Sequence, residues 1–206
     1  MALTIYGIAA SRAIRPLWAA EELGLPYRHV PWHYNGPETR EPAYLAINPN
    51  GTVPAIDDGG LLLFESLAIT LHLAQTRPAG GLWSDTPEGV AGLYQWTLWA
   101  ATEIEPLARQ WFHHTSFLPP EQRIESLATA ALDKLQARLA VLERHLAGRE
   151  WLVGERFSVA DLNLAAVLQR LDALGRGELP HTRAWHQRCL ARPAAQRAWA
   201  LRQAKA

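Results

Sequence analysis

Two hydroxyl side chains near the start of the chain are spaced to hold an anion. Tyr6 ends a β-prone segment, residues 2–6, and Ser11 precedes a helical segment after the small-residue loop 7–10. Backbone N–H groups at a helix start favour negative charge, so a thiolate or a phosphate can rest there and accept a hydrogen bond from Ser11. The structural alternative is a Ser that only caps the helix and a Tyr that only packs in the core.

A second cluster is the run Asn48-Pro49-Asn50-Gly51-Thr52-Val53-Pro54-Ala55-Ile56. Its two prolines and its glycine predict a turn followed by an extended strand. Val53–Pro54 is a candidate cis bond, although only about one X–Pro bond in twenty is cis. A cis proline there leaves the N–H and C=O of Val53 at the sheet edge, where they can pair with a peptide-like ligand. The alternative is an ordinary loop that enters an edge strand.

A third cluster, Glu65 and Ser66, directly follows a predicted strand. Ser66 and the N–H groups after it can hold a carboxylate, and Glu65 can hold an ammonium, so the pair suits the zwitterionic end of a small peptide. The alternative is a capped helix beside a surface charge. The fourth cluster, Ser158-Val159-Ala160-Asp161, is a capping box with Phe157 before it, and we expect it to serve folding and stability.

Composition limits the classes of function. The 206 residues carry 20 Lys and Arg against 20 Asp and Glu, and this balance argues against nucleic acid as a partner. No apolar run is long enough to span a bilayer and no signal-peptide pattern precedes the first strand, so we expect no membrane partner and a cytoplasmic protein. The single cysteine, Cys189, excludes an internal disulfide framework, and eight His residues without metal-ligand spacing predict no metal site.

The strands and helices that position the first three clusters are predicted to form an α/β domain in the N-terminal half of the chain. Two β-prone segments flank a helical one, which predicts a parallel pair joined by a crossover helix. Asp58-Gly59-Gly60 then predicts a hairpin, and a further helix follows Ser66 as its cap. The expected elements are strand 2–6, helix 12–23, strand 27–31, strands 54–57 and 61–64, and helix 67–76.

The second half reads as all-helical. Apolar residues recur there every three or four positions, and the only strand-like stretch is residues 151–153. Helices are expected over 88–114, 121–146, from Ser158 onward, 182–191 and 194–204. An α/β half followed by an all-α half predicts two domains. We expect them at residues 1–77 and 88–206, with a Pro- and Gly-rich linker over 78–87.

In this order, the four clusters and their surroundings resemble the glutathione transferase superfamily over nearly the whole chain. The stretches that carry the resemblance are Tyr6-Gly7, Ser11-Arg12-Ala13, Leu17-Trp18, Glu22-Leu23-Gly24-Leu25-Pro26-Tyr27, Asn48 to Pro54, Glu65-Ser66 and Gly154 to Asp161. The resemblance implies a thioredoxin-like N-terminal domain with a mixed four-stranded sheet in the order βαβ-ββα. It also implies an all-α C-terminal domain and, in most relatives, a homodimer.

The resemblance implies a binding site for glutathione as co-substrate. Val53 would pair its backbone with the cysteinyl unit, Glu65 and Ser66 would bind the γ-glutamyl end, and Asn50 or Thr52 would lie near the glycyl end. The implied glutathione-binding residues are Asn50, Thr52, Val53, Pro54, Glu65 and Ser66.

The resemblance offers two hydroxyls to activate the thiol. Ser11 matches the activating serine of the theta-like and zeta-like classes, and Tyr6 matches the tyrosine of the alpha, mu and pi classes. We favour Ser11, with Arg12 supporting the thiolate. A free thiol titrates near about 8.5, so lowering its pKa by one unit favours the thiolate by about 1.4 kcal/mol.

The reaction implied is conjugation of glutathione to a small apolar electrophile. Its pocket is expected between the loop 8–10 and the first long helix of the second domain. The candidate lining residues are Ile8, Ala9, Trp99, Trp111, Phe112 and His114. The alternative for the aromatic residues is helix core, and for the histidine an exposed position near a helix end.

Other functions remain open on the same fold. Glutathione-dependent isomerases, dehalogenases, lyases and peroxidases share it, although Ala9-Ala10-Ser11 departs from the Ser-Ser-Cys motif of zeta-like isomerases, and the single cysteine excludes a Cys-x-x-Cys reductase. An alternative of another class is a non-catalytic binding or protein-interaction module. That alternative predicts a damaged glutathione site, whereas all the implied binding residues are present.

Overall fold

The computed structural model describes residues 3–174 and 176–202. The contacts divide the chain into two compact units. The first holds the described residues of Met1–Asp85 together with those of Leu190–Ala206, and the second holds those of Thr86–Cys189. The C-terminal segment, expected within the helical domain, therefore groups with the α/β unit.

The first unit is built on a mixed four-stranded sheet. Its strands are β1 (Leu3–Tyr6), β2 (Tyr27–Val30), β3 (Ala55–Asp58) and β4 (Leu61–Phe64), in the spatial order β2-β1-β3-β4. β1 runs parallel to β2 and antiparallel to β3, and β3 runs antiparallel to β4. This confirms the expected βαβ-ββα fold.

The β3–β4 hairpin turns at two glycines, as its sequence predicts. Gly59 and Gly60 have φ values of 67° and 100°, which residues with a Cβ rarely adopt. The Asp57 carboxylate accepts the N–H of Gly60 at 2.7 Å and closes the turn.

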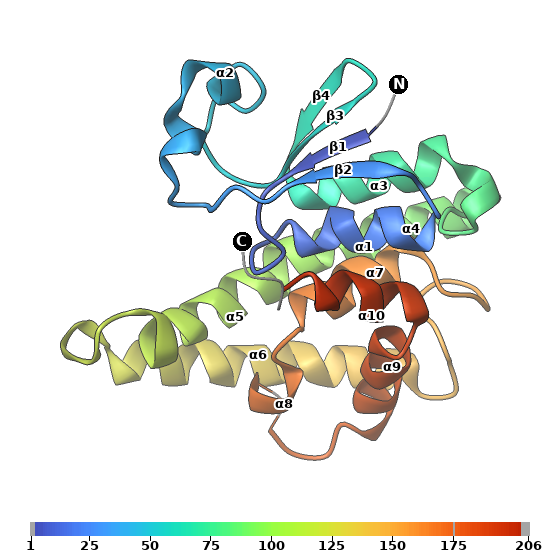
Figure 1. The fold of residues 1–206 in the computed structure, drawn as a ribbon. Helices are drawn as coiled ribbons and strands as arrows, with labels where there is room; N and C mark the ends of the chain where they lie inside the picture. Colours follow the sequence, from blue (N-terminus) through green and yellow to red (C-terminus); the bar gives the residue numbers. More distant parts are fainter. Residues whose placement is uncertain (1–2, 175, 203–206) are drawn as a thin grey trace. The chain divides into compact units, whose positions relative to one another are not determined.

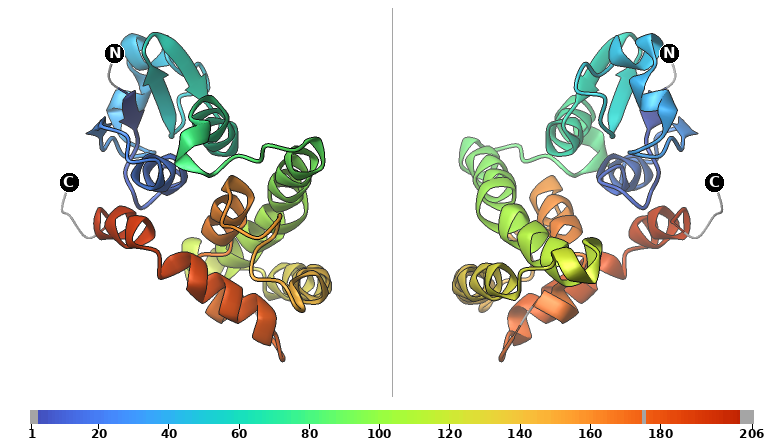
Figure 2. Two further views of the ribbon diagram at one scale, coloured as in Figure 1. Left: turned by 90° about the vertical axis from the view of Figure 1, so that its right-hand side faces the viewer. Right: turned by 90° about the vertical axis from the view of Figure 1, so that its left-hand side faces the viewer.

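Helices α1 (Ile14–Glu22), α2 (Pro42–Leu45) and α3 (Ser66–Thr76) complete the α/β part of this unit. α1 and α3 pack against each other and lie on the same side of the sheet (Figures 1 and 2). Because both helices turn apolar faces inward, the core of the unit consists of buried aliphatic residues from the sheet and from the two helices. These include Ile5, Ile56, Ile14, Leu17, Ile69 and Leu73.

A fourth helix, α10 (Pro193–Ala200), packs on α1 (Figure 1). The Trp18 and Trp199 rings meet edge to face at 5.3 Å. The Arg192 guanidinium donates two hydrogen bonds to the Glu22 carboxylate, at 2.7 and 2.8 Å. These contacts explain why the C-terminal segment belongs to the first unit.

The second unit is helical, and its first helix departs from the sequence expectation. In place of one α-helix over 88–114, α4 (Pro87–Trp99) and α5 (Glu105–Phe112) are joined by the π-helical turn Ala100–Ile104, and a second π-helical turn spans His113–Phe117. Pro106 lacks the N–H that would continue the α-helical pattern, which accounts for the widened turn before it.

The remaining helices form the rest of this unit (Figure 1): α6 (Glu125–Leu146), α7 (Val159–Val167), α8 (Leu171–Leu174) and α9 (Pro180–Leu190). α6 begins four residues later than expected because Pro120–Gln122 forms a separate 3-10 turn. Its buried stripe follows the predicted spacing and includes Leu135, Leu139, Leu142 and Leu146. None of the helices in the described part of the chain is long and apolar enough to cross a membrane.

The capping box at Ser158 is confirmed. The Asp161 carboxylate accepts the N–H of Ser158 at 2.9 Å and its hydroxyl at 2.7 Å. The same carboxylate accepts the N–H of Leu152 and the indole N–H of Trp185, both at 2.9 Å. Asp161 thus ties together the start of α7, the preceding loop and α9. Residues 151–153, the one strand-like stretch, are loop and contain this contact.

Candidate active site

The first three clusters meet at one end of the sheet. Tyr6, the last residue of β1, pairs with Val30, the last of β2, and with Ala55, the first of β3. Ala55 in turn pairs with Phe64, the last of β4. The segments that leave β1, β2 and β4, and the segment that enters β3, therefore all lie at this end. The strand register alone brings the three clusters into one neighbourhood.

Ser11 lies in the turn that leads into α1 and is not the cap of that helix. The helix begins at Ile14 with Ala13 as N-cap, and residues 11–13 form a turn in which the N–H of Ile14 bonds to the Ser11 carbonyl at 3.2 Å. The Ser11 hydroxyl accepts the N–H of Ala13 at 3.1 Å and donates to the Ile8 carbonyl at 2.7 Å. The expected helix start at residue 12 and the expected N-cap are corrected accordingly. Arg12 is exposed in the same turn.

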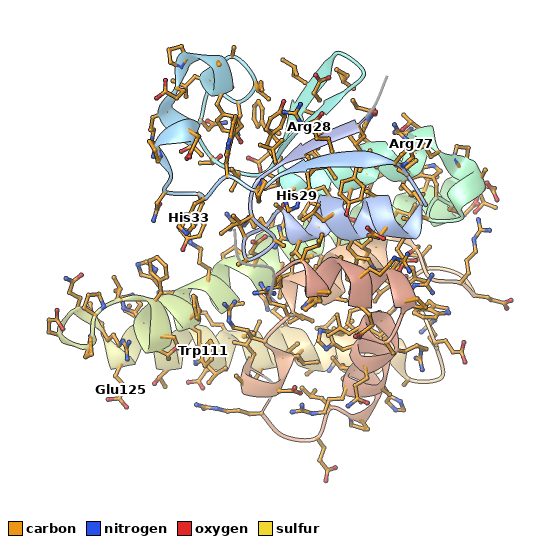
Figure 3. The ribbon with its side chains drawn as sticks, viewed as in Figure 1. Arg28, His29, His33, Arg77, Trp111 and Glu125 are labelled. Atoms are coloured by element: carbon orange, nitrogen blue, oxygen red, sulfur yellow. The ribbon has the colours of Figure 1, made fainter. Side chains whose placement is uncertain are left out.

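Gly7 allows the turn to pack against the proline loop. Its φ is 119°, and a Cβ at this position would lie 2.8 Å from the Cβ of Val53. Its N–H donates to the Val30 carbonyl at 2.8 Å, and its carbonyl lies 2.9 Å from Nε2 of His29, which Figure 3 shows on β2. Both the backbone conformation and the close approach require glycine.

The Tyr6 ring packs in an aromatic cluster. Its centroid lies 5.4 Å from that of Trp32 and 5.9 Å from that of Tyr44, and Trp32 meets Tyr44 edge to face at 5.3 Å. The cluster also includes the buried side chains of Val53 and Ala55. This packing is by itself a reason for a large aromatic residue at position 6, and it does not require a catalytic role of the Tyr6 hydroxyl.

The proline loop is held by two buried side chains: Tyr44, which lies outside the four clusters, and Asn48, which opens the second cluster but had no role assigned to it. The Tyr44 hydroxyl donates to the Thr52 carbonyl at 2.6 Å, and the Asn48 amide donates to the same oxygen at 2.7 Å. Burial raises the pKa of Tyr44 to about 12, so it stays a neutral donor. Asn48 also accepts the N–H of Asn50 at 3.1 Å. The run of turn-forming residues 48–51 was the only sequence signal for this arrangement.

The Val53–Pro54 bond is cis, as predicted. The Val53 side chain is 9% exposed. Within the described residues, its N–H and C=O take no part in the hydrogen bonds of turns, loops and caps. Asn50 and Thr52 are exposed beside it. Because β3 pairs with both β1 and β4, Val53 leads into an interior strand and not into an edge strand as expected. Its backbone is thus available to an extended ligand at this end of the sheet.

Glu65 and Ser66 open α3 in an unusual backbone geometry. Glu65 is the N-cap of the helix with φ 70° and ψ 107°, and Ser66, expected to be the cap, is the first helical residue. A non-glycine residue at positive φ costs free energy and is frequent at ligand sites. The Glu65 side chain is exposed, whereas Ser66 is 3% exposed and accepts a hydrogen bond from the Arg15 guanidinium at 2.9 Å.

The two loop residues expected to line the electrophile pocket lie in the first unit. Ala9 is buried, and Ile8 is half-buried with its N–H donating to the Trp32 carbonyl at 3.0 Å. The Ile8 carbonyl accepts a hydrogen bond from the Ser11 hydroxyl. Both backbone groups of Ile8, a candidate pocket residue, are therefore hydrogen-bonded, which fixes the conformation of the loop.

The other four pocket candidates lie along α4, α5 and the π-helical turn that follows. Trp99, Trp111, Phe112 and His114 are each half-buried; Figure 3 marks Trp111 on α5. Trp99 meets the buried Trp96 edge to face at 5.2 Å, and the ring of His114 accepts the N–H of Ile124 at 3.3 Å.

Phe112 has a partner that sequence reasoning missed. The Arg170 guanidinium lies 3.9 Å from the centroid of the Phe112 ring, and burial lowers the pKa of Arg170. Only the fold brings residue 170, which follows α7, to α5, so no local pattern could have identified it. The arrangement gives this part of the helical unit both an aromatic and a cationic surface.

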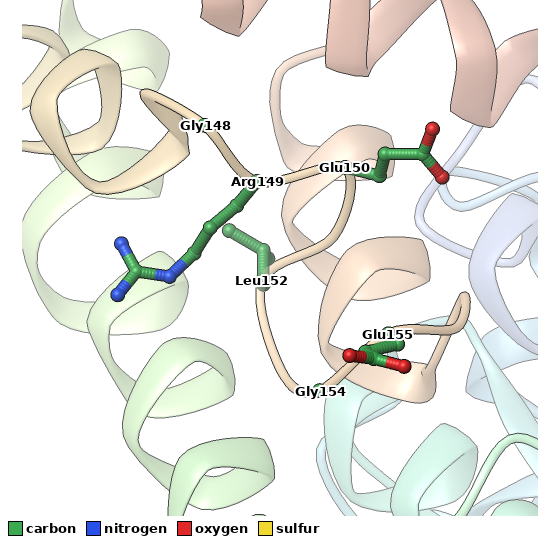
Figure 4. Close-up of a pocket in the computed structure, with 6 residues that line it drawn as sticks. All are labelled: Gly148, Arg149, Glu150, Leu152, Gly154 and Glu155. Carbon is green, nitrogen blue, oxygen red and sulfur yellow. The ribbon is translucent and has the colours of Figure 1, made fainter.

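A surface depression of about 620 Å³ lies elsewhere in the helical unit, on the loop between α6 and α7 (Figure 4). It is lined by Gly148, Arg149, Glu150, Leu152, Gly154 and Glu155. It includes none of the candidate site residues. Among residues 3–174 and 176–202, no group of three or more His, Cys, Asp or Glu side chains is arranged to hold a metal ion.

Comparison with known proteins gives matches along most of the chain. Residues 1–75 match the family model of the glutathione S-transferase N-terminal domain, and residues 108–193 match that of the C-terminal domain. Glutathione S-transferase 4 of Zea mays is 34% identical over 201 residues, which cover 94% of this chain and 90% of the maize protein. The crystal structure of a theta class glutathione S-transferase from Xanthomonas axonopodis pv. citri, with glutathione bound, superimposes with a TM-score of 0.87 at 35% identity and covers 96% of both chains.

A relative of another kind is also found. Elongation factor 1-gamma of Equus caballus is 31% identical over 191 residues, which cover 88% of this chain but 42% of the elongation factor.

Proposed function

The chain belongs to the glutathione S-transferase family, and on that premise we propose that it joins the thiol of glutathione to small apolar electrophiles. The observation that carries the proposal is the convergence of three groups at one end of the sheet: the Ser11 hydroxyl, the backbone of Val53 and the Glu65-Ser66 pair. These groups suit, in turn, a thiolate, a peptide backbone and a zwitterionic amino-acid end.

In this proposal the first unit binds glutathione in an extended conformation. Val53 pairs its N–H and C=O with the cysteinyl unit. The exposed Glu65 carboxylate receives the γ-glutamyl ammonium, and Ser66 with the first N–H groups of α3 receives the α-carboxylate. Asn50 and Thr52, both exposed on the same loop, lie toward the glycyl end.

Ser11 activates the sulfur by donating a hydrogen bond to it. The hydroxyl turns from the Ile8 carbonyl to the thiolate, while the first N–H groups of α1 and the guanidinium of Arg12 favour the negative charge. The thiol proton passes to water. The sulfur then forms a bond to the electrophilic carbon, and a leaving group such as a halide departs with its electron pair.

Candidate electrophile-binding residues are proposed in each unit by itself: Ile8 and Ala9 in the loop of the first unit, and aromatic residues along α4 and α5 in the helical unit. The candidates in the helical unit are Trp99, Trp111, Phe112 and His114, to which we add Arg170 because it covers Phe112. A homodimer is part of the proposal, and sedimentation velocity of the purified protein tests it.

The proposal is tested by two measurements on the same preparation. A thermal-shift titration with glutathione and with an S-alkyl glutathione should raise the melting temperature in both cases. A thioether conjugate of glutathione should then form with at least one class among aryl halides, epoxides and isothiocyanates. Reduction of hydroperoxides without conjugation of any of these classes would instead indicate peroxidase activity.

A non-catalytic binding module is the second candidate, and the similarity to elongation factor 1-gamma favours it. The two candidates differ in turnover and not in fold. Binding of glutathione without reaction with any electrophile of the panel would favour the module, as would failure to bind glutathione at all.

A further inference from the structure

Arg15 and Ser66 form a buried polar contact between α1 and α3. Nη1 of Arg15 donates to Oγ of Ser66 at 2.9 Å, and the two residues are 4% and 3% exposed. A guanidinium buried to this extent is costly unless its N–H groups find acceptors, and the hydrogen bond to Ser66 offsets part of this cost. The contact reaches the first residue of α3, where the proposed site for glutathione begins.

The chemistry of the contact fixes the role of the serine hydroxyl. A guanidinium has five N–H donors and no acceptor, so Oγ of Ser66 must accept in this hydrogen bond. The hydroxyl proton of Ser66 therefore remains for another group. A charged donor also polarises the hydroxyl and strengthens the hydrogen bond that it gives. Ser66 is thus prepared to donate to an anion.

We propose that Arg15 is a positioning residue that makes Ser66 a hydrogen-bond donor for the α-carboxylate of the γ-glutamyl group, so that the site selects ligands with a free carboxylate at this end. The inference rests on the proposed function, since it assigns a role within the glutathione site. It adds a charged residue of α1 that does not itself contact the ligand.

The neighbouring Glu65 determines the orientation in which the site binds a zwitterionic ligand. Its exposed carboxylate precedes Ser66 at a backbone φ of 70°, which places an acceptor of cations directly before a donor to anions. With the positive charge of Arg15 behind Ser66, a zwitterion is favoured in one orientation only. In the reverse orientation each ligand charge would meet a like charge.

The test compares two ligands that differ only in the carboxylate. S-Methylglutathione carries it, and S-methylated 4-aminobutyryl-cysteinyl-glycine lacks it. Isothermal titration calorimetry gives the dissociation constant of each for wild type, Arg15→Met, Arg15→Lys and Ser66→Ala. Arg28→Met is the matched control, because Arg28 is an exposed arginine on β2 of the same unit (Figure 3).

We expect wild type and R28M to prefer S-methylglutathione over the analogue. R15M and S66A should each lose about tenfold or more in affinity for S-methylglutathione, as for a hydrogen bond to a charged group, and less than about twofold for the analogue. R15K should retain part of the preference, since an ammonium also donates to Oγ. The double variant R15M/S66A should lose no more than either single variant, because the two residues act as one unit.

The outcomes separate this inference from the proposed function. If R15M loses affinity equally for both ligands, Arg15 only supports the fold. That result would overturn the inference while the proposed function stands. If R15M does not fold, S66A and R15K decide by the same comparison. Wild type that binds neither ligand would overturn the proposed function, and the inference with it.

Discussion

The hydroxyl of Ser11 donates its only proton to the carbonyl oxygen of Ile8, 2.7 Å away. This hydrogen bond closes the turn before α1. In the proposed mechanism, the same hydroxyl proton instead forms a hydrogen bond to the sulfur. Since Ser11 also accepts the N–H of Ala13, the side chain is already oriented from its acceptor side. Activation of a bound thiol then requires only rotation of the O–H bond.

Replacing Ser11 with Ala should raise the thiol pKa of bound glutathione. Loss of one hydrogen bond to the thiolate is worth about 1–2 pKa units, which corresponds to about 1.4 kcal/mol per unit. Because the thiolate is the reactive form, the pH profile of kcat/KM should shift to higher pH, with the largest loss near neutrality.

Ultraviolet titration of the bound thiolate and the pH profile of kcat/KM check this prediction. Ser11→Thr is the control, since it keeps the hydroxyl, and it should retain most of the activity. An S11A variant with the wild-type thiol pKa and full turnover would remove Ser11 from the mechanism.

Tyr6→Phe tests the other candidate hydroxyl. The Tyr6 ring packs against Trp32 and Tyr44, and phenylalanine preserves these ring contacts. We expect kcat/KM to change by less than about twofold and the thiol pKa to stay at its wild-type value. Tyr6→Ala should instead lower the free energy of unfolding by about 3 kcal/mol or more, as for other large-to-small changes in packed clusters.

The pH profile of turnover and denaturant unfolding of the two variants provide the comparison. A right-shifted pH profile in Y6F would assign activation to Tyr6 and contradict the preference for Ser11.

Features encoded in consecutive residues could be predicted from the sequence. The cis Val53–Pro54 bond, the Gly59-Gly60 turn and the Ser158–Asp161 capping box are local patterns, and all three are confirmed. Their signals are local because proline, glycine and short polar side chains act on their own stretch of backbone. The same reasoning predicted the order of the four strands and of α1 and α3 in the first unit, but not α2 or the place of α10 in that unit.

Contacts between distant residues could not be predicted in this way. The Arg15–Ser66 hydrogen bond joins two helices, and the Arg192–Glu22 ion pair joins residues 170 positions apart. An amphipathic pattern shows that α10 buries one face but does not show which helix covers it. The helix start at Ile14 was also missed, because Ser11 caps a turn before the helix in the same way that it would cap the helix itself.

Asp161→Ala should strongly destabilise the helical unit. The carboxylate is 0% exposed and is the acceptor for two backbone N–H groups, a hydroxyl and the indole of Trp185. Removing it leaves these buried donors without an acceptor, at a cost of about 3 kcal/mol or more in the free energy of unfolding. Burial raises the pKa of Asp161 even though its four donors act to lower it, which reflects how completely water is excluded.

Urea unfolding followed by tryptophan fluorescence measures this loss. Glu155→Ala is the matched control, because Glu155 is an exposed acid in the same loop region, and its effect should stay within about 0.5 kcal/mol. Comparable effects of the two substitutions would show that the Asp161 contacts contribute little to stability.

Arg192→Met and Arg197→Met should separate the two ion pairs between α10 and α1. Arg192 binds the Glu22 carboxylate, whose side chain is 6% exposed, through two hydrogen bonds. Arg197 binds the Glu21 carboxylate, which is 20% exposed, while Arg197 itself is 56% exposed. Without Arg192, the buried Glu22 carboxylate still accepts the indole N–H of Trp18 but loses its charged donor. We therefore expect R192M to lower the free energy of unfolding by about 2 kcal/mol and R197M by less than about 1 kcal/mol, since the more exposed pair is screened by water.

Urea unfolding of both variants gives the comparison, and Trp18 and Trp199, which touch each other, report on the α1–α10 contact by fluorescence. If R197M proves the more destabilising variant, the buried ion pair of Glu22 is not the main contact between α10 and α1.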